Sequence, residues 1–412
     1  MARIACLCYS GSLAHAGRTV TVARELARRG HDVTLCGQPR YLESSLLVDR
    51  GELPLEVLHE PDLSAVLAPS RGGADDEQAG AFAFAGAVHD ELQLFSRLRP
   101  QVVVVDNRRS AIVSAARIGV PSVSLTNASL LGSLSAIDPL RSELADIGGP
   151  AVGLPPMEMR QSPALRGRAD DEVIPIAARP LPPVLADFIG SQGITPPASV
   201  HELSLGTRTL VLDDAGMFPV RDLPGGTRQV GPLTFDVATQ MPRWWWSLPE
   251  QLPFVYVTFG STGSAPLLER LIEALIGLGT QLVATTADLI QTVPDGVHAC
   301  RYLPGSEVAR RARLVVCHGG SLTMYQALAG GTPVMAVPTH FEQAIEAIPF
   351  VRAGVARALS QVDVAADPAS AAATARGMLD DAALHRRTED AGRRIDPTAA
   401  LVACADTVEE LV

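Results

Sequence analysis

The stretch Cys317–Gln343, CHGGSLTMYQALAGGTPVMAVPTHFEQ, indicates how the second half of this chain folds. It follows the apolar run of residues 314–316 and opens with a glycine pair. A helix-like segment then ends at a second glycine pair, before Pro333. A strand, a glycine turn and a helix in this order are typical of an α/β unit. The stretch contains no Asp, Lys or Arg, and Glu342 is its only carboxylate.

The glycine turn predicts an anion-binding site. Ser321 and Thr323 stand where the helix begins, so N–H groups there lack intrahelical partners and carry a partial positive charge that suits phosphate. The pair Gly319 and Gly320 lets the backbone approach an anion closely, and His318 can donate to an oxyanion. A second glycine–serine turn, at residues 258–264, could meet the phosphate from another side.

Apolar runs alternate with amphipathic ones along most of the chain. In the first half the predicted strands are RIACLCY, HDVTLCG, QVVVVD and VPSVSLT, and a second series begins near Pro253. Such alternation implies parallel sheets covered on both faces, so we expect an α/β fold with two Rossmann-like doubly wound domains. Two such domains facing one another would bind ligands in a cleft at the carboxyl ends of their strands.

The length of 412 residues favours two domains. We place an N-terminal domain at 1–235, a linker at 236–252 and a C-terminal domain at 253–395. A final helix at 396–412 is expected to pack back on the N-terminal domain. Residues 130–197 are rich in Pro, Gly and Ser, and they form either a binding insertion or a surface excursion.

Composition excludes several classes of protein. The formal net charge of -11 argues against a nucleic-acid partner. All 34 basic residues are Arg, and the lack of Lys excludes a Walker P-loop and a pyridoxal phosphate Schiff base. The six cysteines are scattered, and Cys6 and Cys8 lie on one face of a predicted strand, which favours buried free thiols over metal ligands.

No membrane association is expected. The uncharged run at residues 314–341 is interrupted by His318, Gln326, glycines and prolines, which argues against a membrane helix. The N-terminus MARIACLCYSGS suits a first strand better than a signal peptide. We therefore expect a cytoplasmic protein.

The quoted motifs resemble the nucleotide-sugar signature of family-one glycosyltransferases with the GT-B fold, including bacterial antibiotic and macrolide enzymes. That pattern reads roughly H-G-G-x-G-T, Ala-Leu, Gly-x-Pro, Pro and Asp-Gln. This chain has His-Gly-Gly-Ser-Leu-Thr, Ala-Leu at 327–328, Gly-Thr-Pro at 331–333, Pro338 and Glu-Gln at 342–343. The chain departs from the pattern at Leu322, which replaces a small residue, and at Glu342, which replaces Asp.

The resemblance assigns the donor site to the second half of the chain. It implies a base pocket at Tyr302 and Leu303 and sugar contacts from Glu342 and Gln343. Gln326 stands where members that use UDP-sugars commonly carry a ribose-binding Glu, so a dTDP-sugar is favoured. The implied diphosphate ligands are Ser261, His318, Gly319, Gly320, Ser321 and Thr323.

The segment SGSLAHAGRTVTVARELARRGH resembles the family's N-terminal loop and helix, and it places His15 at the position of the catalytic base. Asp106, which ends the strand QVVVVD, would orient His15. Histidine suits general-base catalysis near neutral pH. Taken alone, His15 could be a surface residue, and Asp106 could cap the helix that follows it. In this family the insertion at 130–197 would form the acceptor pocket of an acceptor-binding N-terminal domain.

The resemblance implies an inverting hexosyltransferase that moves a sugar from dTDP or UDP to a hydroxyl of a small natural-product aglycone in antibiotic or other secondary metabolism. The partners would be the nucleotide-diphosphate sugar and the aglycone, and the protein a monomer or homodimer. No cofactor is implied. No D-x-D occurs, so we expect metal-independent transfer.

Two alternatives to this enzyme remain. One is a catalytically silent GT-B auxiliary protein that activates a partner glycosyltransferase. The other is a nucleotide-sugar epimerase.

Overall fold

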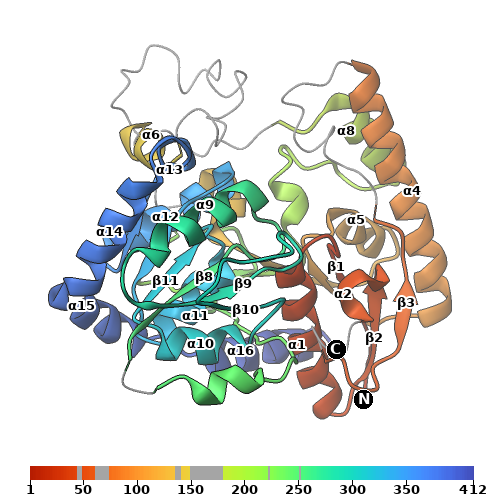
Figure 1. Ribbon diagram of the computed structural model, residues 1–412. Coiled ribbons are helices and arrows are strands. Elements are labelled where there is room, and N and C mark those ends of the chain that lie inside the picture. Colours follow the sequence, from red (N-terminus) through yellow and green to blue (C-terminus); the bar gives the residue numbers. More distant parts are fainter. Residues whose placement is uncertain (44–48, 61–73, 135–140, 149–179, 221–222, 250–251) are drawn as a thin grey trace. The chain divides into compact units, whose positions relative to one another are not determined.

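The computed structural model describes residues 1–43, 49–60, 74–134, 141–148, 180–220, 223–249 and 252–412 (Figure 1). The chain divides into two compact units. The first comprises Met1–Ala136, Pro175–Leu233 and Pro397–Val412, and the second comprises Ile137–Ile174 and Thr234–Asp396.

The first unit is built on a seven-stranded parallel sheet with the order β3-β2-β1-β4-β5-β6-β7. The chain runs outward from β1 to β3 and then returns to β4 on the other side of β1. This reversal is the topological switch point at which doubly wound sheets bind ligands. The strands are β1 (Arg3–Cys8), β2 (Asp32–Gly37), β3 (Leu55–Val57), β4 (Val102–Asp106), β5 (Ser122–Thr126), β6 (Arg208–Val211) and β7 (Thr227–Gln229).

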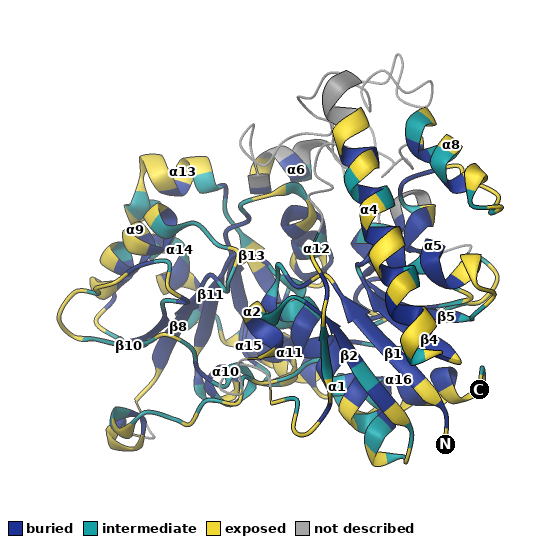
Figure 2. Cartoon of the chain, turned by 90° about the vertical axis from the view of Figure 1, so that its right-hand side faces the viewer, coloured by how far each residue is buried: buried dark blue, intermediate teal, exposed yellow. Residues whose placement is uncertain are grey.

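The central strands of this sheet are buried on both faces, as the runs of apolar residues predicted. Every residue of β4 and β5 is buried, and Figure 2 shows β1 and β4 in dark blue beside helices whose outer faces are exposed. The helices of this unit are α1 (Leu13–Arg28), α2 (Pro39–Leu42), α4 (Ala74–Leu98), α5 (Arg109–Arg117), α8 (Pro183–Ser191) and α16 (Pro397–Glu409), with 3-10 turns at Ala128–Leu134 and Glu202–Ser204.

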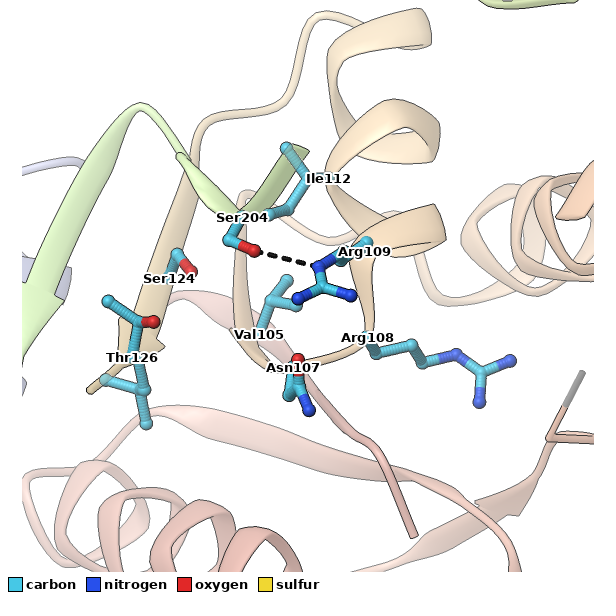
Figure 3. A pocket seen from close by; sticks show the side chains of 9 residues that line it. Val105, Asn107, Arg108, Arg109, Ile112, Ser124, Thr126 and Ser204 are labelled. Carbon is cyan, nitrogen blue, oxygen red and sulfur yellow. Dashed lines mark hydrogen bonds between the residues drawn. The ribbon is translucent and has the colours of Figure 1, made fainter. Parts of the chain in front are cut away.

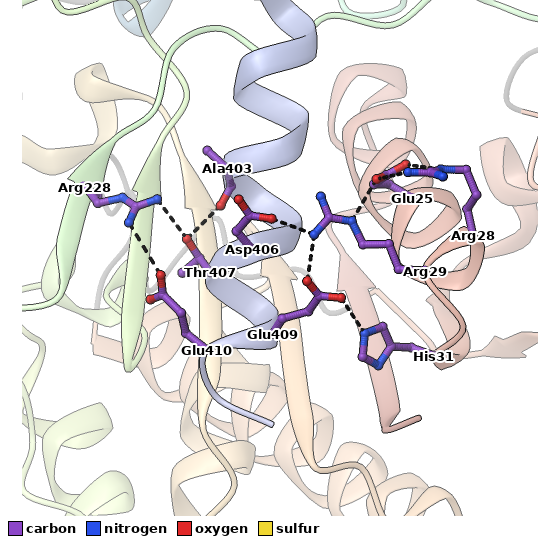
Figure 4. A network of polar contacts seen from close by, with 10 residues as sticks. All are labelled: Glu25, Arg28, Arg29, His31, Arg228, Ala403, Asp406, Thr407, Glu409 and Glu410. Carbon is purple, nitrogen blue, oxygen red and sulfur yellow. Dashed lines mark hydrogen bonds and ion pairs between the residues drawn. The ribbon is translucent and has the colours of Figure 1, made fainter.

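The C-terminal helix α16 packs against α1 within the first unit. Arg29, which follows α1, donates to Asp406 at 2.6 Å and to Glu409 at 2.7 Å. Glu409 also lies 3.0 Å from Nε2 of His31 (Figure 4). These ion pairs link the end of α1, the helix that carries His15, to the C-terminal helix α16.

The second unit is built on a six-stranded parallel sheet with the order β10-β9-β8-β11-β12-β13. Its switch point lies between β8 and β11. The strands are β8 (Phe254–Thr258), β9 (Gln281–Thr285), β10 (Val297–Cys300), β11 (Leu314–Cys317), β12 (Val334–Ala336) and β13 (Ala356–Ala358). The helices are α6 (Arg141–Gly148), α9 (Ala265–Ile276), α10 (Gly305–Arg311), α11 (Ser321–Ala329), α12 (Phe341–Arg352), α13 (Gln361–Ala366), α14 (Pro368–Asp380) and α15 (Ala382–Gly392), with a 3-10 turn at Arg243–Ser247.

The expected insertion at 130–197 lies partly outside the described residues, at 135–140 and 149–179. Its described helix α6 packs on α12 of the second unit, where Arg352 donates to Glu143 at 2.6 and 2.8 Å. Helix α8 packs on α4 of the first unit. The described helices of the insertion are therefore divided between the units, whereas the family resemblance had placed the insertion in the N-terminal domain.

The three consecutive tryptophans of the linker differ in their surroundings. Trp245 is 1% exposed and packs on Phe254, with the Arg311 guanidinium 4.6 Å from its ring centroid. Trp244 stacks on His298, and Trp246 is 74% exposed. Trp245 thus anchors the linker to the second unit's own core.

Candidate active site

His15 and Asp106 meet at the switch point of the first unit. His15 lies in the first turn of α1, and Asp106 ends β4 beside the last residue of β1. Nδ1 of His15 lies 2.7 Å from Oδ1 of Asp106. The Asp106 side chain is 0% exposed and that of His15 is 16% exposed. A buried carboxylate thus holds a ring that remains open to solvent, which is the arrangement of a general base and its orienting partner.

Asp106 is not the cap of the helix that follows it. The N-cap position of α5 is Arg108, whose side chain makes no capping hydrogen bond. The carboxylate is taken up by His15 and Arg18 instead. Of the two interpretations that the sequence left open, the cap is therefore wrong.

A third side chain, Arg18, completes this cluster and was missed by sequence reasoning. Its Nε donates to Oδ2 of Asp106 at 3.0 Å, and its Nη2 donates to Oδ1 at 3.0 Å. Nη1 donates to Oδ1 of Asn127 at 2.7 Å, and Nη2 lies 2.8 Å from Nδ1 of His15. Residues three apart share one face of a helix, so the spacing of His15 and Arg18 was the available signal.

The environment of Asp106 keeps its carboxyl ionised. Burial alone would raise the pKa, but the charge of Arg18, the His15 ring and their hydrogen bonds outweigh burial and lower the pKa below the ordinary value. The cluster continues through Asn127 to the buried Asp213, which also accepts from the Ala128 N–H at 2.6 Å. Asp213, beyond the carboxyl end of β6, therefore accepts hydrogen bonds from the segment that follows β5.

Asn107 approaches the other side of the His15 ring. Its Nδ2 lies 3.4 Å from Nε2 of His15, and its backbone has a φ of 55°, in the left-handed region. A small pocket opens beside Asn107 at the carboxyl ends of β4 and β5 (Figure 3). Arg109 donates to Ser204 at 2.9 Å across it. Its lining residues are Val105, Asn107, Arg108, Arg109, Ile112, Ser124, Leu125, Thr126 and Ser204.

In the second unit, the glycine turn joins β11 to α11 as the sequence predicted. Gly319 has a φ of +81°, and a Cβ added there would lie 3.2 Å from the main-chain oxygen of Gln343. Gly320 is the N-cap of α11, and no side chain caps the helix. Ser321, Leu322 and Thr323 form the first turn and are half-buried. The N-terminus of α11, with its partial positive charge, thus follows directly on the glycine turn, where an anion can bind.

His318 is buried next to this helix terminus and is 7% exposed. Its Nδ1 is buried and has no hydrogen-bond partner within the described part of the chain. Burial, with a smaller contribution from His340, lowers the pKa of His318 to about 4. A neutral imidazole with an unsatisfied nitrogen beside a helix N-terminus suits an anionic ligand.

The predicted second turn, between β8 and α9, packs against the same histidine. A Cβ added to Gly260 would lie 3.0 Å from Cε1 of His318. Gly263 is required by the turn itself, because a Cβ there would lie 2.3 Å from the Phe259 main-chain oxygen. Ser261, half-buried between these glycines, thus belongs to a turn that meets the His318 turn at the switch point.

Glu342 and Gln343 form the first turn of α12. Glu342 is exposed and lies 2.9 Å from Nδ1 of His340. Gln343 is 4% exposed, and its Oε1 accepts from the N–H of Thr339 at 2.8 Å and from its hydroxyl at 2.9 Å. Of this predicted sugar-binding pair, only Glu342 is open to solvent.

The three residues predicted to hold the base and ribose have different surroundings. Tyr302 is half-buried and Leu303 is 4% exposed, in the loop between β10 and α10. Gln326 is 7% exposed, and its side-chain nitrogen donates to the Phe235 carbonyl at 2.8 Å and to Asp236 at 3.2 Å. The amide of Gln326 is thus engaged by the linker rather than turned outward.

Comparison with known proteins places this chain among glycosyltransferases. Residues 254–373 match the glycosyltransferase family 28 C-terminal domain. A PGL/p-HBAD biosynthesis glycosyltransferase of Mycobacterium tuberculosis is 28% identical over 350 residues, 84% of this chain and 78% of that protein. A PGL/p-HBAD biosynthesis rhamnosyltransferase of Mycobacterium bovis is 39% identical over 151 residues, 36% and 34% of the two chains. An inactive PGL/p-HBAD biosynthesis glycosyltransferase of Mycobacterium bovis is 26% identical over 269 residues, 65% and 69%.

Solved structures share the fold over the whole chain. The kitacinnamycin glycotransferase superposes with a TM-score of 0.70 at 21% identity, covering 100% of this chain and 99% of that one. The spinosyn rhamnosyltransferase SpnG, complexed with thymidine diphosphate, has a TM-score of 0.66 at 19% identity, with coverage of 97% and 99%. These structures show that the chain has the GT-B fold, and the matches together identify it as a glycosyltransferase. The match to the family 28 C-terminal domain lies within the second unit.

None of the helices within the described ranges combines the length and the apolar character that crossing a membrane requires.

Proposed function

We propose that this protein is an inverting glycosyltransferase in which His15 is the general base and the second unit binds a nucleotide-diphosphate sugar. The observation that carries the proposal is the 2.7 Å contact between Nδ1 of His15 and the buried, ionised Asp106. Nε2 of His15 takes the proton of an acceptor hydroxyl as its oxygen attacks the anomeric carbon and the nucleoside diphosphate leaves. General-base catalysis of this kind contributes roughly 10²–10⁴-fold in rate.

The donor diphosphate binds at the N-terminus of α11. The N-terminus of this helix and His318 stabilise the leaving phosphate without a lysine, with Ser261 on the opposing turn. Glu342 accepts from sugar hydroxyls. The residues at the base and ribose are Tyr302, Leu303 and Gln326. No cofactor or metal is required, because these groups stabilise the charge that develops on the diphosphate.

We propose dTDP-activated deoxysugars as donors, ahead of UDP-hexoses. A neutral Gln326 offers no carboxylate to grip both ribose hydroxyls, and the relatives named above include two rhamnosyltransferases, one complexed with thymidine diphosphate. The acceptor is a hydroxyl of a small, largely apolar natural product, and the reaction belongs to cytoplasmic secondary metabolism.

The test combines two variants with one binding assay. His15→Ala is expected to abolish transfer to a promiscuous phenol acceptor, and Asp106→Asn to reduce it by several orders of magnitude. Both variants should retain the thermal stabilisation that dTDP gives the wild type, because ligand bound to the native state raises the melting temperature. Full transfer by His15→Ala would refute the role of His15.

One observation favours the silent auxiliary protein as a second candidate. Nη2 of Arg18 lies 2.8 Å from Nδ1 of His15. If Nδ1 accepted that proton, Nε2 would carry the ring hydrogen and His15 could not act as a base there. A relative named as inactive makes this candidate worth testing. Wild-type protein that neither transfers sugar nor hydrolyses any dTDP- or UDP-sugar would support it.

A further inference from the structure

Arg18 is a buried cation that the proposed mechanism does not use. Its side chain is 6% exposed, and it lies in the same cluster as the base and its orienting carboxylate. A histidine beside an isolated carboxylate is favoured in its protonated form, and a protonated ring cannot accept a proton. The guanidinium opposes this effect because it places a positive charge against the same carboxylate.

We propose, resting on the proposed function, that Arg18 is a positioning residue: it fixes Asp106 so that Oδ1 accepts the Nδ1 proton of His15, and its charge keeps the ring neutral with Nε2 free at neutral pH.

The position of the carboxylate is fixed from two sides. Arg18 grips both oxygens of Asp106 through Nε and Nη2, each at 3.0 Å, and planar two-point pairing of this kind specifies orientation as well as distance. The remaining guanidinium nitrogen, Nη1, donates to Oδ1 of Asn127 at 2.7 Å, and Nδ2 of Asn127 donates to Asp213. Rotation of the Asp106 carboxylate would break this chain of contacts, so Oδ1 stays directed at His15.

The contacts of His15 distinguish its two neutral tautomers. Oδ1 of Asp106 is a charged acceptor 2.7 Å from Nδ1, which favours a proton on Nδ1. On the other side of the ring, the Asn107 amide nitrogen lies 3.4 Å from Nε2. That amide nitrogen can only donate, so it favours a lone pair on Nε2. A third contact, from Nη2 of Arg18 at 2.8 Å to Nδ1, would suit the other tautomer, but Nη2 also donates to Oδ1 of Asp106 at 3.0 Å. With the Nη2 proton directed at Oδ1, the remaining two contacts favour the tautomer that a base acting at Nε2 needs.

Two cysteine thiols close to this cluster stay neutral. Burial raises the pKa of Cys8, at the end of β1, to about 12, and burial likewise raises the pKa of Cys404, on α16, to about 12. The rings of Tyr9 and His15 are steeply inclined to each other, with their centroids 5.9 Å apart. Among the described residues, the charged side chains that contact the His15 ring are Asp106 on β4 and Arg18 on its own helix, and Asp213 lies behind Asn127.

The experiment observes the His15 ring by NMR in the intact protein labelled with ¹⁵N-histidine, and His15→Gln assigns its signals. In the wild type at pH 7.5 we expect the neutral tautomer with the proton on Nδ1. In Arg18→Met the midpoint of the His15 titration should rise by about one pH unit or more, because a positive charge within hydrogen-bonding distance is removed. Arg18→Lys retains the charge, so its midpoint should stay close to the wild-type value.

Arg24→Met is the matched control, since Arg24 lies on the same helix but pairs with Asp49 in solvent, where the two side chains are 53% and 51% exposed. Its His15 midpoint should not move. A wild-type proton on Nε2, or an unchanged midpoint in Arg18→Met, would overturn the proposal. If Arg18→Met does not fold, the wild-type tautomer and Arg18→Lys still decide. None of these measurements requires sugar transfer. The proposed function is refuted separately, by full transfer activity in His15→Ala.

Discussion

The side-chain amide of Gln326 donates to the carboxylate of Asp236 at 3.2 Å and to the main-chain carbonyl of Phe235 at 2.8 Å. Asp236 also accepts from the N–H of Ser306 at 2.7 Å. Gln326 therefore ties α11 to the linker and to the start of α10. A glutamate at this position could not donate to either acceptor.

Gln326→Glu is accordingly expected to destabilise the second unit rather than to switch the donor from dTDP to UDP. A buried carbonyl would lose its donor and two carboxylates would face each other, at a cost of about 1–3 kcal/mol. Thermal unfolding with and without dTDP and UDP measures both effects. Gln240→Glu, on an exposed linker residue, is the control and should leave the melting temperature unchanged. A stable Gln326→Glu variant that prefers UDP would show that the amide contacts are dispensable.

The close approach of Gly319 to α12 leads to a second prediction. Gly319→Ala introduces a Cβ 3.2 Å from the Gln343 oxygen and should displace the turn that carries the proposed diphosphate ligands. We expect dTDP binding to weaken at least about tenfold, a difference of about 1.4 kcal/mol. Titration calorimetry with dTDP provides the measurement.

Gly279→Ala is a matched control for this variant. Gly279 also has a left-handed φ, of +72°, but a Cβ there meets nothing within 4 Å. Both substitutions share the backbone strain of about 1–2 kcal/mol, and only Gly319→Ala adds the steric contact. Equal dTDP affinities in the two variants would show that the close contact between residue 319 and the Gln343 oxygen does not affect dTDP binding.

The packing of α16 on the first unit makes a third prediction. Val408 is 0% exposed, whereas Val402 on the same helix is 41% exposed. Val408→Ala should lower the free energy of unfolding by about 2 kcal/mol, because it leaves a cavity, and Val402→Ala should change it little. Chemical denaturation followed by far-UV circular dichroism compares the two. Similar losses in both variants would mean that α16 does not pack on the first unit as described.

The strands and glycine turns could be predicted from the sequence because their signals are local. The runs QVVVVD and RLVV predicted strands that coincide with β4 and β11, and the glycines at 319–320 predicted the turn that follows β11. These patterns were sufficient to bring Asp106 and His318 to the carboxyl ends of central strands. The contact of His15 with Asp106 was anticipated only through the family resemblance.

The role of Arg18 could not be read from its own segment, GRTVTVARELARRG, which contains four arginines. Arg18 is buried, whereas Arg24 and Arg28 are exposed, and only the packing of α1 against the ends of β4 and β5 separates them. The division of the 130–197 insertion between two units is likewise set by long-range contacts. Neither feature has a local signature.

The buried His318 makes a fourth prediction, on the dependence of stability on pH. Its pKa is lowered to about 4 in the folded protein, from an ordinary value of 6.5, because burial disfavours the charged ring. Between these two values the unfolded chain binds the proton that the native state excludes, so stability falls as the pH is lowered from 6.5 towards 4. Protonation of His318 in the unfolded chain therefore lowers the free energy of unfolding by about 2 kcal/mol at pH 5 relative to pH 8.

His318→Gln, which cannot titrate, tests this contribution when free energies of unfolding are measured at pH 8 and at pH 5. The variant should lose about 2 kcal/mol less stability between these pH values than the wild type loses. His89→Gln, at an exposed position on α4, should follow the wild type. If His318→Gln and the wild type lost the same stability on acidification, the folded protein would not lower the pKa of His318, and the prediction would be wrong.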